Sequence, residues 1–322
     1  MNRIYTKILT VGLFIITPLL CFAQDDMKFV AITAIVEHPA LDSVRQGVED
    51  ELKEQGYIQG KNLKLQFQSA QGSSANAAQI AKQFAAAKPD VIVAIATPSA
   101  QALAATSKSI PIVFTAVTDP VAARLVKSWQ ANGTNVTGVS DALSLDKQID
   151  LMLKIKPDLK TVGSVYSPGE VNSTTILREL ETALAAKGIR LISVPAQRTS
   201  DIPTAARSLK GKVDLIYTTT DNNVVSAYES LVKVANESKI PLVASNPDAV
   251  DRGAVAALGM SYYELGRQTG RMAIRILKGE LPGNIGPEVG DITELVVNQV
   301  AADNQGVTLS QPLLQSAQKI IK

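Results

Sequence analysis

The sequence is poor in the side chains that carry most enzymatic chemistry, with one cysteine and one histidine in 322 residues. The cysteine, Cys21, lies in an N-terminal segment that we expect to be removed, which leaves no disulfide, thiol nucleophile or cysteine metal site. His38 is the only histidine. Because histidine is so scarce, most hydrolase triads and most histidine-based metal or acid–base sites are excluded. We therefore expect no enzyme and no cofactor, although chemistry that uses carboxylates alone, such as glycoside hydrolysis, stays open.

A large excess of charge of one sign is also missing. The chain has 32 basic and 30 acidic residues, and its basic residues form no cluster or stripe. Nucleic-acid binding normally requires such a basic surface, so no nucleic-acid partner is expected. Aromatic residues make up only 4% of the chain, and Trp129 is the only tryptophan. Any aromatic stacking on a ligand would have to come from few residues, and Tyr166 and Phe114 are the candidates at strand ends.

The N-terminus has the pattern of a secretory signal peptide. Arg3 and Lys7 precede a short apolar run over 8–20, and the small residue Ala23 follows. A membrane span needs about 20 apolar residues, which this run does not reach. We predict a signal peptide over 1–23, with cleavage after Ala23 and a periplasmic or other extracytoplasmic protein. The alternatives are an uncleaved anchor and lipid attachment at Cys21, although Leu20 is larger than the residue that usually precedes a lipidated cysteine.

Short β-branched runs alternate with longer amphipathic stretches along the whole chain, which predicts an α/β fold with mainly parallel sheets and helices on both faces. The expected strands are 29–36, 63–67, 91–96 and 112–116, then 162–166, 190–194, 213–218 and 242–245. Two more strands, 254–260 and 295–298, flank a helix that should begin with a capping box at Ser261–Glu264 and stop at Gly279.

A chain of this length suits two lobes better than one core. Because the last 65 or so residues are too few for a third lobe, we expect them to return to the first two, and the resulting crossings would form a hinge. We predict an N-terminal lobe from 24–120 plus 251–282 and a C-terminal lobe from 121–250 plus 283–322.

Five loops that follow predicted strands share a polar residue before a proline. Proline suits the first turn of a helix, where its missing N–H has no helical partner, and a polar residue before it can cap the helix. Ligands bind at the carboxyl ends of parallel strands, so these loops predict a cleft in which helix N-termini face an anion. Taken singly, each loop has a purely structural interpretation as a cap. The pairs are His38-Pro39, Thr97-Pro98, Asp119-Pro120, Ser167-Pro168 and Asn246-Pro247.

Carboxylates lie beside the same loops. They are Glu37, Asp119, Glu170 and Asp221. Helix N-termini together with one or two carboxylates would suit a zwitterion such as a free amino acid. Glu170 and Asp221 also have structural interpretations, since Glu170 has the spacing of a capping-box glutamate and Asp221 suits an N-cap.

Several segments resemble the ABC-transporter substrate-binding family that includes TrpX-type tryptophan-binding proteins. The resemblance covers the chain from about Lys28 to Gly279 and is carried by segments 35–42, 94–101, 116–121, 135–141, 166–173, 220–222 and 262–270. It implies a type I periplasmic-binding-protein fold: two Rossmann-like lobes joined by a three-segment hinge. It also implies an ABC permease with its ATPase as partners, and an apolar or aromatic amino acid as ligand.

We assign roles in the cleft as hypotheses. Thr97, Ser99 and the backbone N–H of Ala100 should hold the ligand carboxylate, and Glu37 and Asp221, with Asp119 in reserve, its ammonium group. Tyr166, Asn172 and Asn246 should complete the far wall. We expect a monomer that closes about its hinge on the ligand. The same fold could instead serve as a sensory module that presents its ligand to a membrane receptor.

Overall fold

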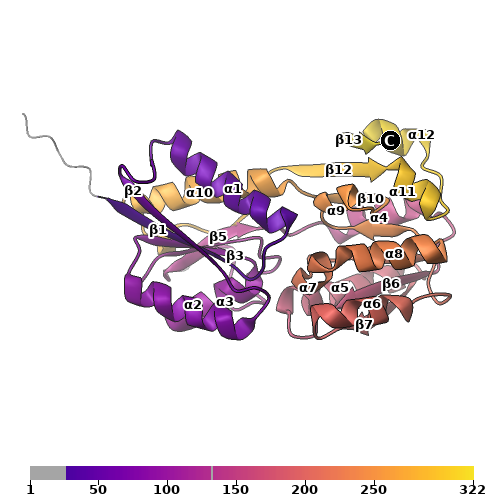
Figure 1. The fold of residues 1–322 in the computed structure, drawn as a ribbon, viewed down its shortest axis with the longest axis horizontal. Coiled ribbons are helices and arrows are strands. Elements are labelled where there is room, and N and C mark those ends of the chain that lie inside the picture. Colours follow the sequence, from indigo (N-terminus) through magenta and orange to yellow (C-terminus); the bar gives the residue numbers. More distant parts are fainter. Residues whose placement is uncertain (1–26, 132) are drawn as a thin grey trace, which may run out of the picture.

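The computed structural model describes residues 27–131 and 133–322, which form two α/β lobes side by side (Figure 1). The predicted signal peptide over 1–23, with Cys21, lies outside the described residues. Among the residues that are described, no helix has both the length and the apolar character needed to cross a membrane.

The first lobe is built on a six-stranded parallel sheet in the order β11-β5-β4-β3-β1-β2. Its central strands are buried on both faces, which is why they consist of uninterrupted apolar residues such as Val91–Ile95. The strands are β1 (Lys28–Ala34), β2 (Leu63–Ser69), β3 (Val91–Ile95), β4 (Ile112–Thr115), β5 (Val136–Ser140) and β11 (Glu288–Val289). The helices are α1 (Pro39–Glu54), α2 (Ser74–Ala87), α3 (Thr97–Thr106) and α10 (Tyr262–Leu277), with a 3-10 turn η2 (Pro282–Asn284).

The second lobe is built on a seven-stranded sheet in the order β13-β12-β10-β9-β8-β6-β7. In this sheet β10 and β12 pair antiparallel to each other, and the other neighbouring strands pair in parallel. Its strands are β6 (Thr161–Tyr166), β7 (Arg190–Pro195), β8 (Leu215–Thr218), β9 (Leu242–Ala244), β10 (Ala256–Met260), β12 (Thr293–Asn298) and β13 (Lys319–Ile321). Its helices are α4 (Leu145–Ile155), α5 (Val171–Ala186), η1 (Thr199–Asp201), α6 (Ile202–Arg207), α7 (Asn222–Ser226), α8 (Tyr228–Ser238), α9 (Asp248–Asp251), α11 (Gln299–Asn304) and α12 (Gln311–Ser316).

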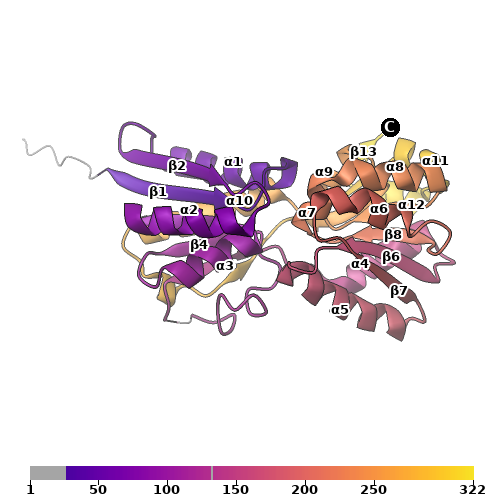
Figure 2. The same ribbon diagram turned by 60° about the horizontal axis from the view of Figure 1, so that its bottom comes forward.

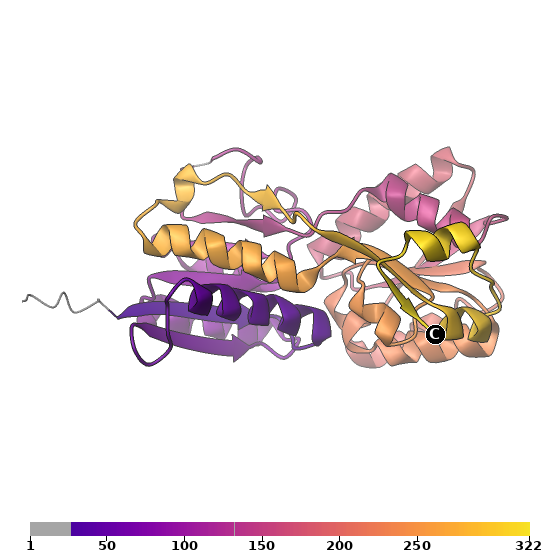
Figure 3. The same cartoon turned by 90° about the horizontal axis from the view of Figure 1, so that it is seen from above.

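The chain passes between the two sheets three times: after β5, after β10 and after β11 (Figures 1 and 3). The crossing segments are bonded to one another, since Gly290 N donates to Ser140 O and Ser261 N donates to Ile292 O, both at 2.9 Å. This arrangement confirms the predicted α/β fold with two lobes and a three-segment hinge.

The crossings lie at other positions than the sequence led us to expect. β5 belongs to the first sheet, although 121–250 was expected in the C-terminal lobe, and β10 belongs to the second sheet, although 251–282 was expected in the N-terminal lobe. β11 returns to the first sheet for two residues before β12 joins the second. The expected boundaries differ from the observed ones because a strand has the same local pattern whichever sheet it joins.

Helix α10 starts at the second crossing and packs closely on α1 of the first lobe (Figure 3). Glycines permit this close approach: a Cβ added at Gly266 would lie 2.1 Å from Val44 O, and one at Gly47 would lie 2.2 Å from Tyr263 O. The expected capping box of α10 is not formed, because the side chain of the N-cap residue Ser261 makes no capping hydrogen bond. The start of α10 is therefore positioned by helix packing and by the hinge.

Candidate ligand-binding site

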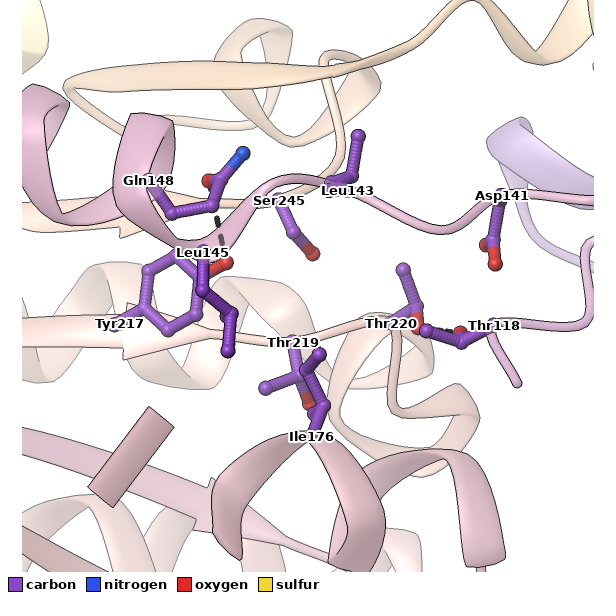
Figure 4. A pocket seen from close by; sticks show the side chains of 10 residues that line it. All are labelled: Thr118, Asp141, Leu143, Leu145, Gln148, Ile176, Tyr217, Thr219, Thr220 and Ser245. Atoms are coloured by element: carbon purple, nitrogen blue, oxygen red, sulfur yellow. Dashed lines mark hydrogen bonds between the residues drawn. The ribbon is translucent and has the colours of Figure 1, made fainter. Parts of the chain in front are cut away.

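A cavity of about 280 Å³ lies between the lobes (Figure 4). Most of its wall comes from loops at the carboxyl ends of strands of both sheets, where open parallel sheets bind ligands; α4 and α5 complete it. The lining residues are Thr118, Asp141, Leu143, Leu145, Gln148, Ile176, Tyr217, Thr219, Thr220 and Ser245.

The cavity is polar at both ends and apolar between them. In Figure 4 Asp141 lies near Thr118 and Thr220 at one end, and Tyr217 and Gln148 lie at the other. The side chains of Leu143 and Ile176 lie between the two ends on opposite walls. Such a cavity matches an elongated ligand with a charged head, an apolar body and a polar tip.

Two further cavities adjoin the first. One, of about 250 Å³, shares Asp141 and Thr220 with it and is also lined by His38, Asn246 and Tyr262. The other, of about 510 Å³, shares Thr118, Leu143 and Ile176 with it and is lined in addition by Asp119, Trp129, Asn172, Thr175 and Glu179 among others. The shared residues join the three spaces into one cleft region between the lobes.

Asp141 is the buried carboxylate of this region that borders two of its cavities. Its Oδ2 accepts a hydrogen bond of 2.9 Å from the Tyr262 hydroxyl, whereas Oδ1 has no partner of ordinary geometry among the described residues. Burial raises the pKa of Asp141, and the Thr118 and Tyr262 hydroxyls lower it. Thr118 shares its hydrogen bond of good geometry with Thr220, at 2.9 Å, and a carboxylate oxygen such as Oδ1 can accept a further hydrogen bond from a ligand.

Asp141 ends segment 135–141, one of those that resemble the family, but it was not among the predicted site residues. Its local signal is weak, because it follows a short strand, β5, that the alternation of strands and helices did not identify. The tertiary structure brings the first crossing segment, which carries Asp141, to the edge formed by the carboxyl ends of the parallel strands of both sheets.

The N-terminus of α3 lies at the same edge of the first sheet, as predicted. The hydroxyls of Thr97 and Ser99 are buried there without a hydrogen-bond partner among the described residues. The residue before them, Ala96, has φ 72° and ψ 155°, a conformation almost confined to glycine that costs about 1–3 kcal/mol and is typical of functional sites. The predicted role of the Ala100 N–H does not fit, because it already donates to Ala96 O at 3.2 Å.

Asp221 has no free capacity for a ligand. Its two oxygens accept hydrogen bonds from Ser167 N at 2.6 Å, Ser167 Oγ at 2.9 Å, Ser173 Oγ at 2.6 Å and Val224 N at 3.0 Å. It is the N-cap of α7 and holds α5 and the β6–α5 loop beside it. We therefore interpret it as a structural carboxylate, which was the alternative that its sequence position allowed.

Glu170 is a second buried carboxylate of this lobe. Its Oε2 accepts hydrogen bonds from Asn172 Nδ2 at 3.0 Å, Asn222 N at 3.1 Å and Asn222 Nδ2 at 2.7 Å. Burial, together with the negative charge of Asp221, raises its pKa to about 7. The capping box with Ser167 is not formed, since Ser167 N donates to Asp221 instead.

The remaining predicted residues divide into two groups. Asn172 and Asn246 line the adjoining cavities, and so does Asp119, whose Oδ1 also caps a turn by accepting from Val121 N and Ala122 N at 2.9 Å. Glu37 is exposed, Tyr166 is half-buried against apolar residues of the second lobe, and Phe114 is buried against Gly138. None of these three lines the cavities described above.

The proline loops fit the prediction in part. Pro39 and Pro98 lie in the first turns of α1 and α3, and Pro247 is the N-cap of α9. Pro168 lies in the loop before α5 but three residues ahead of its first residue, and the loop of Pro120 leads to β5 instead of a helix. His38 lines the 250 Å³ cavity as a neutral side chain, because burial and the charge of Arg252 lower its pKa to about 4.

Comparison with known proteins gave one family and several close relatives. The model of the family described as ABC transporter substrate binding protein matches residues 29–321. A tyrosine-binding protein of Clostridioides difficile (strain R20291) is 41% identical over 272 residues, which cover 84% of this chain and 79% of the relative.

Two solved structures differ in their ligand state. One, an ABC domain from Streptococcus pneumoniae in complex with L-Trp, is 32% identical with a TM-score of 0.88, and the match covers 91% of this chain and 99% of that one. The other, a substrate binding protein with adhesive properties from Clostridium difficile in a ligand-free, open structure, is 38% identical with a TM-score of 0.70, and the match covers 92% and 99%.

Proposed function

Because the chain belongs to the family of ABC transporter substrate-binding proteins, we propose that it captures an aromatic amino acid between its lobes and delivers it to an ABC permease with its ATPase. The protein would be exported and act outside the cytoplasm as a monomer. The observation that carries the ligand class is the cavity of about 280 Å³ with buried Asp141 at one end and an apolar middle. The relatives named for tyrosine binding and solved with L-Trp support it.

In this proposal the ammonium group of the ligand binds Asp141. A buried carboxylate without a counter-charge is unfavourable, and an ammonium group at Oδ1 would supply both the charge and the missing hydrogen bond. Glu37 and Asp221, which we had expected in this role, are respectively exposed and fully hydrogen-bonded within the protein.

The carboxylate of the ligand would lie toward the N-terminus of α3. The first N–H groups of a helix have no helical carbonyl to bind, and its N-terminus carries a partial positive charge. Here the buried hydroxyls of Thr97 and Ser99 add donors, and Ala116 at the end of the neighbouring strand lines the 250 Å³ cavity.

Closure of the lobes on the ligand is supported by two observations. The arrangement of the lobes is more similar to the L-Trp complex than to the open structure, although the open relative has the higher sequence identity. In addition, Thr118 of the first lobe and Thr220 of the second share a hydrogen bond of 2.9 Å across the cleft. A ligand that contacts both lobes would favour this closed state by binding it more tightly than the open one.

Isothermal titration of the mature protein with all common amino acids tests the proposal. We expect tyrosine or tryptophan to bind and Asp141→Asn to weaken binding by about thirtyfold or more, because truncating one partner of a buried charge pair costs roughly 2–5 kcal/mol. Asp303→Asn, which changes an exposed carboxylate of the second lobe, is the control. A flat response to every amino acid would reject the ligand class.

A further inference from the structure

We infer that Ser245 and Thr219 select ligands whose side chain carries a polar hydrogen, a phenol or an indole, over ligands with a plain phenyl ring. The inference rests on the proposed function, in which the ammonium group lies at Asp141 and the side chain extends away from it along the cavity. It assigns the recognition of the ligand side chain to the hydroxyls of two residues that directly follow neighbouring strands of the second sheet.

The two residues lie on opposite walls of the cavity, Ser245 on the wall of Leu143 and Thr219 beside Ile176 (Figure 4). Ser245 follows β9 and Thr219 follows β8, and the two strands are paired up to the bond from Ser245 N to Thr218 O at 3.0 Å. Figure 4 shows the Ser245 hydroxyl directed toward the centre of the cavity, with Thr219 on the opposite side. Both residues line this cavity.

Neither hydroxyl has a hydrogen-bond partner of good geometry among the described residues, although Ser245 is 3% and Thr219 2% exposed. A buried hydroxyl without a partner is uncommon in a native protein and calls for an explanation. Ser245 is near enough to the Tyr217 hydroxyl to lower the pKa of Tyr217, which burial raises, but the two groups do not meet hydrogen-bond geometry. A polar group of the ligand between the two walls would supply the missing partner.

The end of the cavity behind them is polar and held in place. The Tyr217 hydroxyl donates to Gln148 Oε1 at 3.2 Å, and Gln148 Nε2 donates to Leu258 O at 2.8 Å. With its proton committed to Gln148, the Tyr217 oxygen can still accept a hydrogen bond. A phenol or an indole N–H can donate at this end. A phenyl ring would leave the Ser245 and Thr219 hydroxyls unpaired and would give the Tyr217 oxygen no donor.

Such a site discriminates between ligands because the wrong ligand leaves buried polar atoms of the protein without hydrogen-bond partners. Pockets built to bind a substrate hydroxyl can reject the analogue that lacks it by factors of up to about 10⁵. Two neutral hydroxyls and one tyrosine oxygen are available to bind the polar group of the ligand. Because each neutral hydrogen bond contributes roughly a factor of ten in affinity at most, we expect tyrosine or tryptophan to bind about 10–100-fold more tightly than phenylalanine.

The test is isothermal titration of tyrosine, tryptophan and phenylalanine into the wild-type protein and a Ser245→Ala/Thr219→Val double variant. In the double variant we expect the preferred ligand to lose about tenfold or more in affinity while phenylalanine changes less than about threefold, because only the polar tip has lost its partners. Retained phenylalanine binding also shows that the variant is folded. Ser208→Ala is the matched control, since the Ser208 hydroxyl bonds to Ala205 O within its own helical turn at 2.7 Å.

The outcomes separate this inference from the proposed function. If the wild-type protein binds phenylalanine as tightly as the other two, or if the double variant weakens all three equally, the selection by Ser245 and Thr219 is overturned while amino-acid capture stands. If none of the three binds to the wild-type protein, the proposed function itself fails. A preference for tyrosine over tryptophan, or the reverse, identifies which polar tip the two hydroxyls read.

Discussion

The hydroxyl of Tyr262 donates a hydrogen bond of 2.9 Å to Oδ2 of Asp141 inside the cleft. Asp141 lies on the first crossing between the lobes and Tyr262 begins α10 immediately after the second. The bond therefore joins two hinge segments at the carboxylate that we propose for the ligand ammonium. In this proposal, the Tyr262–Asp141 hydrogen bond links ligand binding to the position of the hinge.

Replacing Tyr262 by phenylalanine should weaken ligand binding by about tenfold, because a hydrogen bond to a charged group contributes roughly 1.5–3 kcal/mol and orients the carboxylate. Since the Tyr262 hydroxyl lowers the pKa of Asp141, its removal should raise that pKa, and the loss of affinity should be larger at pH 5.5 than at pH 8. Titration calorimetry at both pH values measures this. Tyr263→Phe, which removes an exposed hydroxyl bonded to Asp50, is the control. An equal loss at both pH values would argue against positioning of the charged form.

Replacing Ser99 by alanine tests the carboxylate end of the site. We expect affinity for the preferred amino acid to fall by about tenfold, since a hydrogen bond to a charged group is lost. Affinity for the corresponding amino-acid amide, already weak because it has no negative charge, should change little. Ser43→Ala, whose exposed hydroxyl bonds to Pro39 O, is the control. Equal losses for the acid and the amide would place the ligand carboxylate elsewhere.

Glu170 should make stability fall as pH rises. Its pKa is about 7 in the folded protein, above the value near 4.5 of the unfolded chain, so the folded state binds the extra proton. The stabilisation is complete below pH 4.5 and is lost as pH rises through about 7, with an upper limit of about 3 kcal/mol.

Urea unfolding of the wild-type protein and Glu170→Gln at pH 5 and pH 8 measures this contribution. Because glutamine cannot ionise, the variant should lack this part of the fall in the free energy of unfolding. Glu181→Gln, at an exposed position on α5, the helix that follows Glu170, should behave like the wild type. The same decrease in wild type and Glu170→Gln would show that the burial of Glu170 is not linked to protonation.

Gly266→Ala should destabilise the first lobe. The new Cβ would lie 2.1 Å from Val44 O, a backbone atom that cannot move without shifting α1. Overpacking of this kind costs about 1–3 kcal/mol, which chemical unfolding would detect. At Gly169 an added Cβ has no heavy atom within 4 Å, so Gly169→Ala is the control. Unchanged stability of Gly266→Ala would mean that the helix pair separates easily.

The sequence by itself determined the two α/β lobes, because apolar runs such as Val91–Ile95 and the helices between them are local patterns. It also predicted the edge of the sheets at which we propose the ligand to bind, since the loops at Thr97, Asp119, Asn172 and Asn246 lie there. These conclusions needed only the periodicity of neighbouring residues and the topology of parallel sheets.

Only the tertiary structure decided which polar groups are available to a ligand. Asp221 is occupied by Ser167, 54 residues away along the chain, whereas Asp141 keeps one oxygen free although it bonds Tyr262, 121 residues away. The crossing points between the lobes could not be predicted from the sequence either, because they depend on which sheet each strand joins. A carboxylate has the same side chain whether its oxygens are occupied or free, so its role depends on partners that are distant in sequence and that folding brings together.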